Sequence, residues 1–148
     1  MIDNFRGDYF FLSNFYKSPF VFAGLEWDTC EHAYQAWKSR EWLIREQIRK
    51  LPDAAKARRA GRSLPRRRDW NQVKEPLMLA LLRCKFGQSK ELALKLLATG
   101  DEKLVEGNDW GCVFWGMVKD ADGKWTGENH LGLLLMQVRG ELRIFFSD

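Results

Sequence analysis

The sequence predicts an α+β fold: one domain over residues 1–148, with a mainly helical middle and short strands from both chain ends. Apolar residues recur at helical spacing through the middle of the chain, and short aromatic runs bounded by turn residues occur near both ends. Strands at the ends of a helical middle favour α+β over repeated strand–helix–strand units. A chain of 148 residues is long enough to bury one core.

Composition and charge narrow the class of protein. Hydrophobic residues make up 45% of the chain and charged residues 30%, which is typical of globular proteins, and the net charge of +4 suits an anionic partner without requiring one. Three cysteines without a C-x-x-C pair indicate a reducing compartment, and two distant histidines give no metal site, so we expect no metal and no cofactor. We also expect a cytoplasmic protein, because no apolar run approaches the roughly 18 residues of a membrane span and no signal-peptide pattern occurs.

The first elements are predicted to be strands. The aromatic run Tyr9–Leu12 is β-like and is followed by turn residues. Residues 20–22 and 25–27 predict a hairpin, because Ala23 and Gly24 between them suit a two-residue turn.

A helix is predicted next, running from Asp28 to about Lys50. Asp28 is a suitable N-cap, and Glu31 stands at the capping-box position three residues later. Glu31, Gln35 and Lys38 share one helical face because they are spaced by four and three residues. This face is either solvated or the wall of a site. The residues alone leave both open, since Glu31 has an ordinary role near the positive end of the helix dipole.

Three further helices and their end signals fill the middle of the chain. Residues 53–60 look helical, with Gly61 as the stop signal. Asp69 caps the next helix, in which Pro76 is expected to cause a kink or to delay the start. Ser89 caps a helix over 90–98.

The last third alternates short apolar runs with turn residues before a final helix. It predicts a strand at 103–106, a loop at 107–111, a strand at 113–118, a turn at 120–123 and a helix capped by Asn129. Gly132 and Gly140 lie inside this helix, where glycine costs roughly 1 kcal/mol relative to alanine, so we expect a packing reason for each.

A set of short motifs in this order resembles the NADAR (YbiA-like) family over residues 12–139. The motifs are Leu12-Ser13-Asn14-Phe15, Ser18-Pro19-Phe20, Trp27-x-Thr29-x-Glu31-His32-x-x-Gln35-Ala36-x-Lys38, Gly61-Arg62, Asp69-Trp70-x-x-Val73-Lys74, Lys85-Phe86, Thr99-Gly100, Leu104-Val105-Glu106-Gly107-Asn108, Phe114-Trp115-Gly116 and Asn129-x-Leu131-Gly132. The resemblance implies a compact α+β N-glycosidase. Its substrates would be phosphorylated early riboflavin-pathway intermediates or guanine bases carrying ADP-ribose.

The resemblance also implies the roles of individual residues. It makes Glu31 a catalytic carboxylate, able to stabilise a sugar cation or to take a proton from water, and this reverses the preference for a solvated face. Trp115, Trp70 or Trp110 would stack on the base, and core packing is the alternative for each. The implied substrate-binding residues are Asn14, Phe15, Gln35, Lys38, Arg62, Trp70, Glu106, Asn108, Trp110, Trp115 and Asn129.

One position departs from the family pattern. Many members have Asp three residues before a Trp-Gly pair, where this chain has Cys112. An ordinary thiol is mostly protonated at neutral pH and cannot replace a carboxylate. Either Asp109 or Glu106 compensates, or Glu31 works alone, or the chain binds better than it cleaves. Asp109 and Cys112 are therefore both candidates for the catalytic set.

A basic run over Lys56–Arg68 contains seven Lys and Arg residues. Taken alone, such a run is most often a solvated face. It would also hold the phosphates of a nucleic acid without reading sequence, and this favours ADP-ribosylated guanine in nucleic acid as the substrate. The alternatives are an enzyme of small metabolites and a non-catalytic reader of ADP-ribose or nucleotides. No membrane partner is expected.

Overall fold

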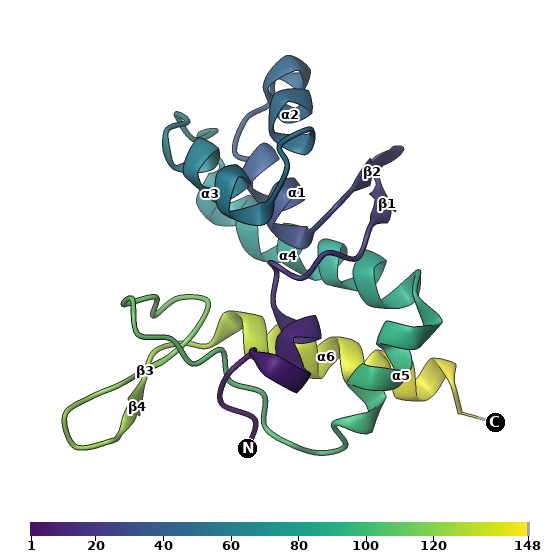
Figure 1. Cartoon of the computed structure of the whole chain (residues 1–148), viewed down its shortest axis with the longest axis vertical. Coiled ribbons are helices and arrows are strands. Elements are labelled where there is room, and N and C mark those ends of the chain that lie inside the picture. The colour runs from purple at the N-terminus through teal and green to yellow at the C-terminus, as the bar shows by residue number, and fades with distance from the viewer. Residues whose placement is uncertain (148) are drawn as a thin grey trace. The chain divides into compact units, whose positions relative to one another are not determined.

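Helices dominate the computed structural model, which describes residues 1–147, and the strands form two small antiparallel hairpins (Figure 1). The predicted α+β class is confirmed in this mostly helical form. The chain divides into two units: unit 1 comprises Met1–Ser13 and Ser89–Asp148, and unit 2 comprises Asn14–Gln88. Within residues 1–147, no helix has the length and the apolar character needed to cross a bilayer.

Unit 2 is built around one short, fully buried helix. Every residue of α1 is buried, and α1 packs against three other helices of the unit. Its polar side chains are therefore held inside the unit. In chain order the elements are β1 (Phe20–Phe22), β2 (Leu25–Trp27), α1 (Cys30–Ala36), α2 (Trp42–Arg49), α3 (Ala54–Arg62) and α4 (Trp70–Gly87).

The β1–β2 hairpin confirms the predicted two-residue turn. Phe20 pairs with Trp27 and Phe22 with Leu25. Ala23 and Gly24 both have positive φ, 53° and 77°, as the tight hairpin turn requires. The hairpin leads directly to α1.

The predicted N-cap of α1 is wrong by one residue. The N-cap is Thr29 rather than Asp28, and the Thr29 hydroxyl accepts a hydrogen bond of 3.1 Å from the His32 backbone N–H. Thr29 also contacts the His32 ring at 2.7 Å, so a threonine fits this buried position. Glu31 therefore has no capping-box role, and its carboxylate is used elsewhere.

The single helix predicted to reach about Lys50 is interrupted after α1. The carbonyl of Lys38 accepts a hydrogen bond of 2.8 Å from the Arg67 backbone N–H. The carbonyl of Ser39 accepts one of 2.8 Å from Arg45 Nε. Because these carbonyls are bonded to distant groups, the helix ends and α2 starts again at Trp42.

The predicted start of α4 is confirmed and the predicted stop at Gly61 is wrong. Gly61 lies inside α3, and Ser63 is the C-cap. Asp69 precedes α4 as its N-cap, but its carboxylate makes no capping hydrogen bond. Pro76 lies inside α4 and does not delay its start.

Unit 1 combines two packed helices with a small hairpin and a single 3₁₀ helix. The helices α5 and α6 pack against each other, and the segment around Leu104 pairs with Ile2 in an isolated parallel bridge. The N-cap Ser89 and the turn between β3 and β4 are as predicted. The elements are η1 (Gly7–Leu12), α5 (Lys90–Ala98), β3 (Val118–Lys119), β4 (Trp125–Thr126) and α6 (His130–Phe145).

Three predicted strands of unit 1 are wrong. Tyr9–Leu12 is part of the 3₁₀ helix η1, and its buried residues Phe11 and Leu12 are adjacent rather than alternating. Residues 103–106 and 113–118 contribute mainly isolated bridges, Ile2 with Leu104 and Gly107 with Met117. Leu104 and Val105 are buried without a sheet, whereas the apolar side chains of residues 113–118 are exposed or half-buried.

The start of α6 is held by the backbone of residues 113–116. The N–H groups of Glu128, Asn129, His130 and Leu131 donate to the carbonyls of Val113, Gly116, Phe114 and Trp115. Asn129 is the N-cap, as predicted, with a φ of 54°, but its side chain makes no capping bond. Gly132 has the expected packing reason, since an added Cβ would lie 2.1 Å from the Leu104 carbonyl oxygen. A Cβ on Gly140 would meet nothing within 4 Å, so the expected reason is missing there.

Candidate active site

Glu31 is the most unusual charged residue of unit 2. Its side chain belongs to the fully buried helix α1, and only 7% of the residue is exposed. Burial raises the pKa of the Glu31 carboxyl above its ordinary value, while the Gln35 hydrogen bond and the positive charges of Arg58 and Lys38 oppose this rise. A buried carboxylate with neighbouring cations has the features of a catalytic base.

Gln35 holds the Glu31 carboxylate in place. Gln35 Nε2 donates a hydrogen bond of 2.8 Å to Glu31 Oε1 across one turn of α1. The other end of the amide, Oε1, is buried and accepts no hydrogen bond from residues 1–147. It lies against Gly61 of α3, where an added Cβ would come within 1.9 Å of it. The close approach of α3 therefore determines the orientation of the amide.

Lys38 lies just past the end of α1 and is also buried. Burial, followed by the charge of Arg66, lowers the pKa of the Lys38 ammonium to about 8, whereas Glu31 acts to raise it. Arg62 and Arg58 lower it further. The predicted stripe of Glu31, Gln35 and Lys38 is thus brought together, and arginines of the basic run surround it.

Two buried aromatic rings lie under the Lys38 ammonium. The nitrogen is 5.7 Å from the centroid of Tyr34 and 6.0 Å from that of Trp70. The two rings are 5.1 Å apart and tilted, with exposed fractions of 8% and 4%. Trp70 therefore packs in the interior of unit 2 and also borders the Lys38 charge.

Asn14 and Phe15 approach the same group of residues from the chain before β1. The Asn14 carbonyl accepts a hydrogen bond of 3.1 Å from the Glu31 backbone N–H. Asn14 Oδ1 is buried and accepts no hydrogen bond within residues 1–147, whereas its amide nitrogen contacts Met78 Sδ at 3.6 Å. The Arg58 guanidinium lies 5.9 Å from the centroid of the Phe15 ring.

Sequence reasoning missed the roles of Arg58, Tyr34 and Gly61 beside Glu31. Tyr34 follows Glu31 by three residues and so shares its helical face, which the spacing could have shown. Arg58 was visible only as one cation of a basic run, because its proximity to Glu31 depends on how α3 packs on α1.

Unit 1 holds a second set of candidate site residues, and Asn108 organises the loop that contains several of them. Its amide nitrogen donates a hydrogen bond of 2.9 Å to the Cys112 carbonyl, and its Oδ1 accepts one of 3.0 Å from the Cys112 N–H. Asn108 thereby closes the loop 108–112. Cys112 is half-buried and makes no disulfide.

Asn129 has a similar structural role. Its Oδ1 accepts a hydrogen bond of 3.0 Å from the Glu106 N–H, and its Nδ2 donates one of 2.9 Å to the Leu104 carbonyl. The amide is 4% exposed and both of its ends bind backbone groups. It joins the segment around Glu106, itself half-buried, to the start of α6.

The tryptophans and the acidic residue of this region differ in exposure. Trp115 is half-buried and lies edge-to-face with Phe114 at 4.8 Å, while Trp110 is 52% exposed. Asp109 is exposed and lines a surface hollow of about 320 Å³ together with Asn108 and Trp125. Within residues 1–147, no three His, Cys, Asp or Glu side chains group closely enough to hold a metal.

Proteins with similar sequences indicate the family of this chain. Residues 3–143 match the family described as the NADAR domain. The chain is 42% identical over 139 residues to N-glycosidase YbiA of Escherichia coli, covering 93% of this chain and 84% of that protein. It is 38% identical over 135 residues to the riboflavin biosynthesis protein VVA0006 of Vibrio vulnificus, covering 90% of this chain and 35% of that protein.

A solved structure agrees with these matches. The NMR structure of the E. coli protein YbiA is similar with a TM-score of 0.82 and 40% sequence identity, over 98% of this chain and 88% of that chain. The extent of these matches, together with a buried glutamate at the motif position, leads to one conclusion. The chain belongs to the NADAR family of YbiA-like N-glycosidases.

Proposed function

We propose that this N-glycosidase removes ADP-ribose from modified guanine bases in nucleic acid, with Glu31 as the catalytic carboxylate. The observation that carries the proposal is the buried Glu31 carboxylate, bonded to Gln35 and set among the charges of Lys38 and Arg58. A buried acid among cations suits a reaction that develops positive charge on a sugar while phosphates are held nearby.

Glu31 acts on the sugar. Cleavage of a base–ribose bond passes through a sugar cation, which a carboxylate stabilises directly or by taking a proton from the attacking water. The hydrogen bond from Gln35 fixes the carboxylate and favours its ionised form. Burial raises its pKa, and a higher pKa makes it a stronger base once ionised.

Lys38 acts on the leaving base. A departing base requires a proton or a hydrogen-bond donor, and an ammonium with a pKa of about 8 is a better acid than an ordinary lysine. The buried rings of Tyr34 and Trp70 lie under this nitrogen and keep its surroundings apolar.

The arginines hold the phosphates. Arg58, Arg62 and Arg66 all influence the Lys38 charge, which places a positive field beside the reacting bond. The basic run also contains exposed cations beyond this group. These favour an extended polyanion over a small metabolite, and they are Lys56, Arg59 and Arg68.

A second candidate is hydrolysis of phosphorylated early riboflavin-pathway intermediates. The similarity to VVA0006, which is named as a riboflavin biosynthesis protein and matches 90% of this chain, favours it. The same Glu31 chemistry applies, because these intermediates also carry a base–ribose bond and a phosphate. A non-catalytic reader is no longer favoured, since the relatives from Escherichia coli and Nostoc punctiforme are both named as N-glycosidases.

The site roles proposed for residues of unit 1 rest on the resemblance to the NADAR family motifs. Asn108 and Asn129 organise the backbone around Cys112 and Glu106, so their substitution is expected to act through the fold of the loop. Trp110 and Trp115 keep exposed surface and remain proposed ring contacts, and Asp109 remains a proposed second carboxylate.

The deciding experiment offers the purified protein both substrates. One arm uses a DNA oligonucleotide with ADP-ribosylated guanine, and the other uses the phosphorylated riboflavin-pathway intermediates. Release of ADP-ribose or of free base is followed by chromatography, with Glu31→Gln as the matched control. We expect turnover in the first arm. Turnover confined to the second arm would establish the metabolite function, and no turnover in either would overturn both.

A further inference from the structure

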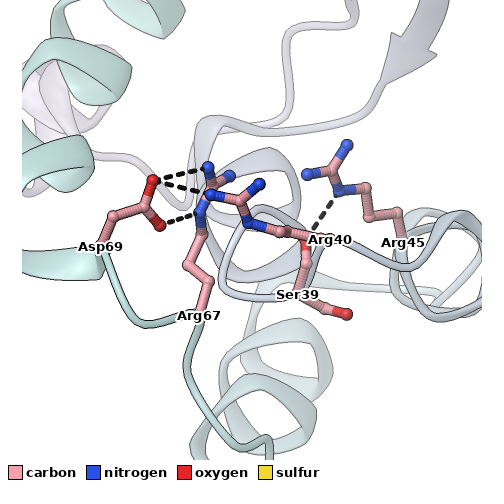
Figure 2. A network of polar contacts seen from close by, with 5 residues as sticks. All are labelled: Ser39, Arg40, Arg45, Arg67 and Asp69. Atoms are coloured by element: carbon pink, nitrogen blue, oxygen red, sulfur yellow. Dashed lines mark hydrogen bonds and ion pairs between the residues drawn. The ribbon is translucent and has the colours of Figure 1, made fainter.

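Two arginines bind a single carboxylate where the loop after α1 meets the segment before α4, and a third arginine lies near them. Arg67 donates two hydrogen bonds to Asp69, at 2.6 and 3.0 Å, and Arg40 donates one at 3.0 Å. Figure 2 shows both guanidinium groups reaching this carboxylate. Arg45 is close enough for the charges of Arg67 and Arg40 to lower its pKa. The cluster of Arg40, Arg45, Arg67 and Asp69 therefore holds three positive charges and one negative charge, a net charge of +2, and the carboxylate pairs with Arg40 and Arg67 only.

Arg45 is held rigidly inside this cluster. Only 7% of the residue is exposed, and its Nε donates a hydrogen bond of 2.8 Å to the Ser39 carbonyl (Figure 2). The guanidinium carbon lies 4.1 Å from the Trp37 ring centroid and 4.9 Å from that of Trp42. Within residues 1–147, Arg45 makes no ion pair with a carboxylate.

A buried guanidinium without a counter-ion is costly. Burial lowers the pKa of Arg45, because removal from water disfavours the charged form of the guanidinium. The cost is removed when an anion with several oxygens binds, because the planar guanidinium matches a phosphate with paired N–H groups. The rigid side chain loses little entropy when it does so.

An exposed aromatic ring borders the cluster. Trp42 is 49% exposed, and its ring lies 5.8 Å from that of Trp37, nearly perpendicular to it. Guanidinium groups beside an exposed indole are the arrangement by which proteins hold single-stranded nucleic acid, with phosphates on the cations and a base on the ring. The exposed cations Arg66 and Arg68 flank Arg67 in sequence and continue the positive charge.

We propose that Arg40, Arg45 and Arg67 form a second phosphate site, which binds the backbone of a single-stranded nucleic acid while Trp42 stacks on a neighbouring base. The choice of nucleic acid as the ligand rests on the proposed function. The site itself rests on the unpaired buried guanidinium and the exposed ring. It adjoins the group around Glu31, since the Arg67 backbone N–H donates to the Lys38 carbonyl, but the side chains of its arginines bind Asp69 and Ser39 rather than the Glu31 carboxylate.

The experiment measures the binding of a short, fluorescein-labelled, unmodified DNA strand by anisotropy between about 50 and 200 mM salt. Arg40→Gln should weaken binding about tenfold at the lower salt concentration and reduce the slope of log K against log salt by about 0.7. Arg45→Lys keeps the charge but loses the planar fork, so affinity should fall with little change in slope. Trp42→Ala should weaken binding about tenfold at every salt concentration.

Two further variants make the result specific. Asp69→Asn frees the arginines without removing a capping bond, so it should tighten binding. Arg83→Gln removes an exposed charge from α4 outside the cluster and should leave binding unchanged. Circular dichroism confirms that each variant folds. If Arg45→Lys does not fold, the exposed Arg40 and Trp42 decide the outcome.

Several results would overturn the site. Unchanged affinity in both Arg40→Gln and Trp42→Ala would show that the site does not exist. An equal loss of affinity in Arg83→Gln would show that binding depends only on general surface charge. Displacement of the strand by micromolar pyrophosphate would assign the site to a small anion. The expected pattern in a protein that does not release ADP-ribose from DNA would refute the proposed substrate and leave this site standing.

Discussion

Gly61 of α3 lies so close to Gln35 of α1 that a Cβ on Gly61 would come within 1.9 Å of the Gln35 amide oxygen and 2.8 Å of its Cβ. The same amide donates the hydrogen bond that fixes Glu31. A missing side chain in one helix thus positions a carboxylate in another.

Gly61→Ala should therefore reduce catalysis through Gln35. The new methyl group forces the amide away from Glu31, and loss of a hydrogen bond to a charged group corresponds to about tenfold or more in rate. The acidic limb of the pH–rate profile should also move to higher pH, because Gln35 lowers the pKa of Glu31 and its loss would raise that pKa. Gly140→Ala is the matched control, since a Cβ there has open space. An unchanged profile in Gly61→Ala would show that the amide tolerates the methyl group.

Glu31→Gln should abolish base release while the melting temperature stays within a few degrees. The substituted amide keeps the size of the side chain and still accepts the hydrogen bond from Gln35. Loss of a general base or charge stabiliser costs about 100- to 10,000-fold in rate. Single-turnover measurements and thermal melts test the two parts separately, and turnover at the wild-type rate would remove Glu31 from the mechanism.

The pH dependence of catalysis should have its alkaline limb near pH 8. The pKa of Lys38 is lowered to about 8, so the ammonium loses its proton as the pH rises through that value and ceases to assist the leaving base. Lys38→Arg should be slower and should lack this limb, because a guanidinium stays protonated. The profile of kcat/KM against pH measures this, and an identical limb in the variant would assign it to another group.

Lys85 should make stability depend on pH in a predictable direction. It is 2% exposed, and burial lowers the pKa of its ammonium to about 8. Between pH 8 and the unfolded pKa of about 10.4, the unfolded chain binds the extra proton, so wild-type stability should rise with pH across this window. Lys85→Met should lack that rise. Denaturant melts of both proteins at several pH values give the difference curve, and parallel curves would contradict the prediction.

Cys112→Asp should cleave faster than the wild type. It puts a carboxylate where the family pattern has one, and one well-placed electrostatic stabiliser is worth about 100- to 1000-fold in rate. Cys112→Ala should change little. If the wild type is already fast, Cys112→Asp is slower and Asp109→Asn is inactive, then Asp109 holds this role instead.

Locally encoded features were predictable from the sequence. The turn at Ala23 and Gly24 depends on backbone dihedrals of two residues. The helix α5 starts where the Ser89 hydroxyl accepts a hydrogen bond from Leu92 N–H three residues later. The pairing of Glu31 with Gln35 follows from a spacing of one helical turn.

Features that depend on distant segments were not predictable. The break after α1 exists because Arg67 and Arg45 bind the carbonyls of Lys38 and Ser39, and nothing in the local sequence marks it. Gly61 looks like a helix stop by residue type, yet it serves the contact between α1 and α3. The influence of Arg58 on Glu31 likewise arises only when these helices pack.

The division of the chain into a continuous unit 2 and a discontinuous unit 1 affects the order in which the units can fold during synthesis. Residues 14–88 are all available once α4 has been made, whereas Ile2 must wait for Lys103 and Val105, whose backbone groups it binds. A ribosome adding about 5 to 20 residues per second needs about one to three more seconds to reach Val105 from Gln88. During that time the backbone of Ile2 lacks these partners, so unit 2 has all its residues before the bridge between Ile2 and Leu104 closes unit 1.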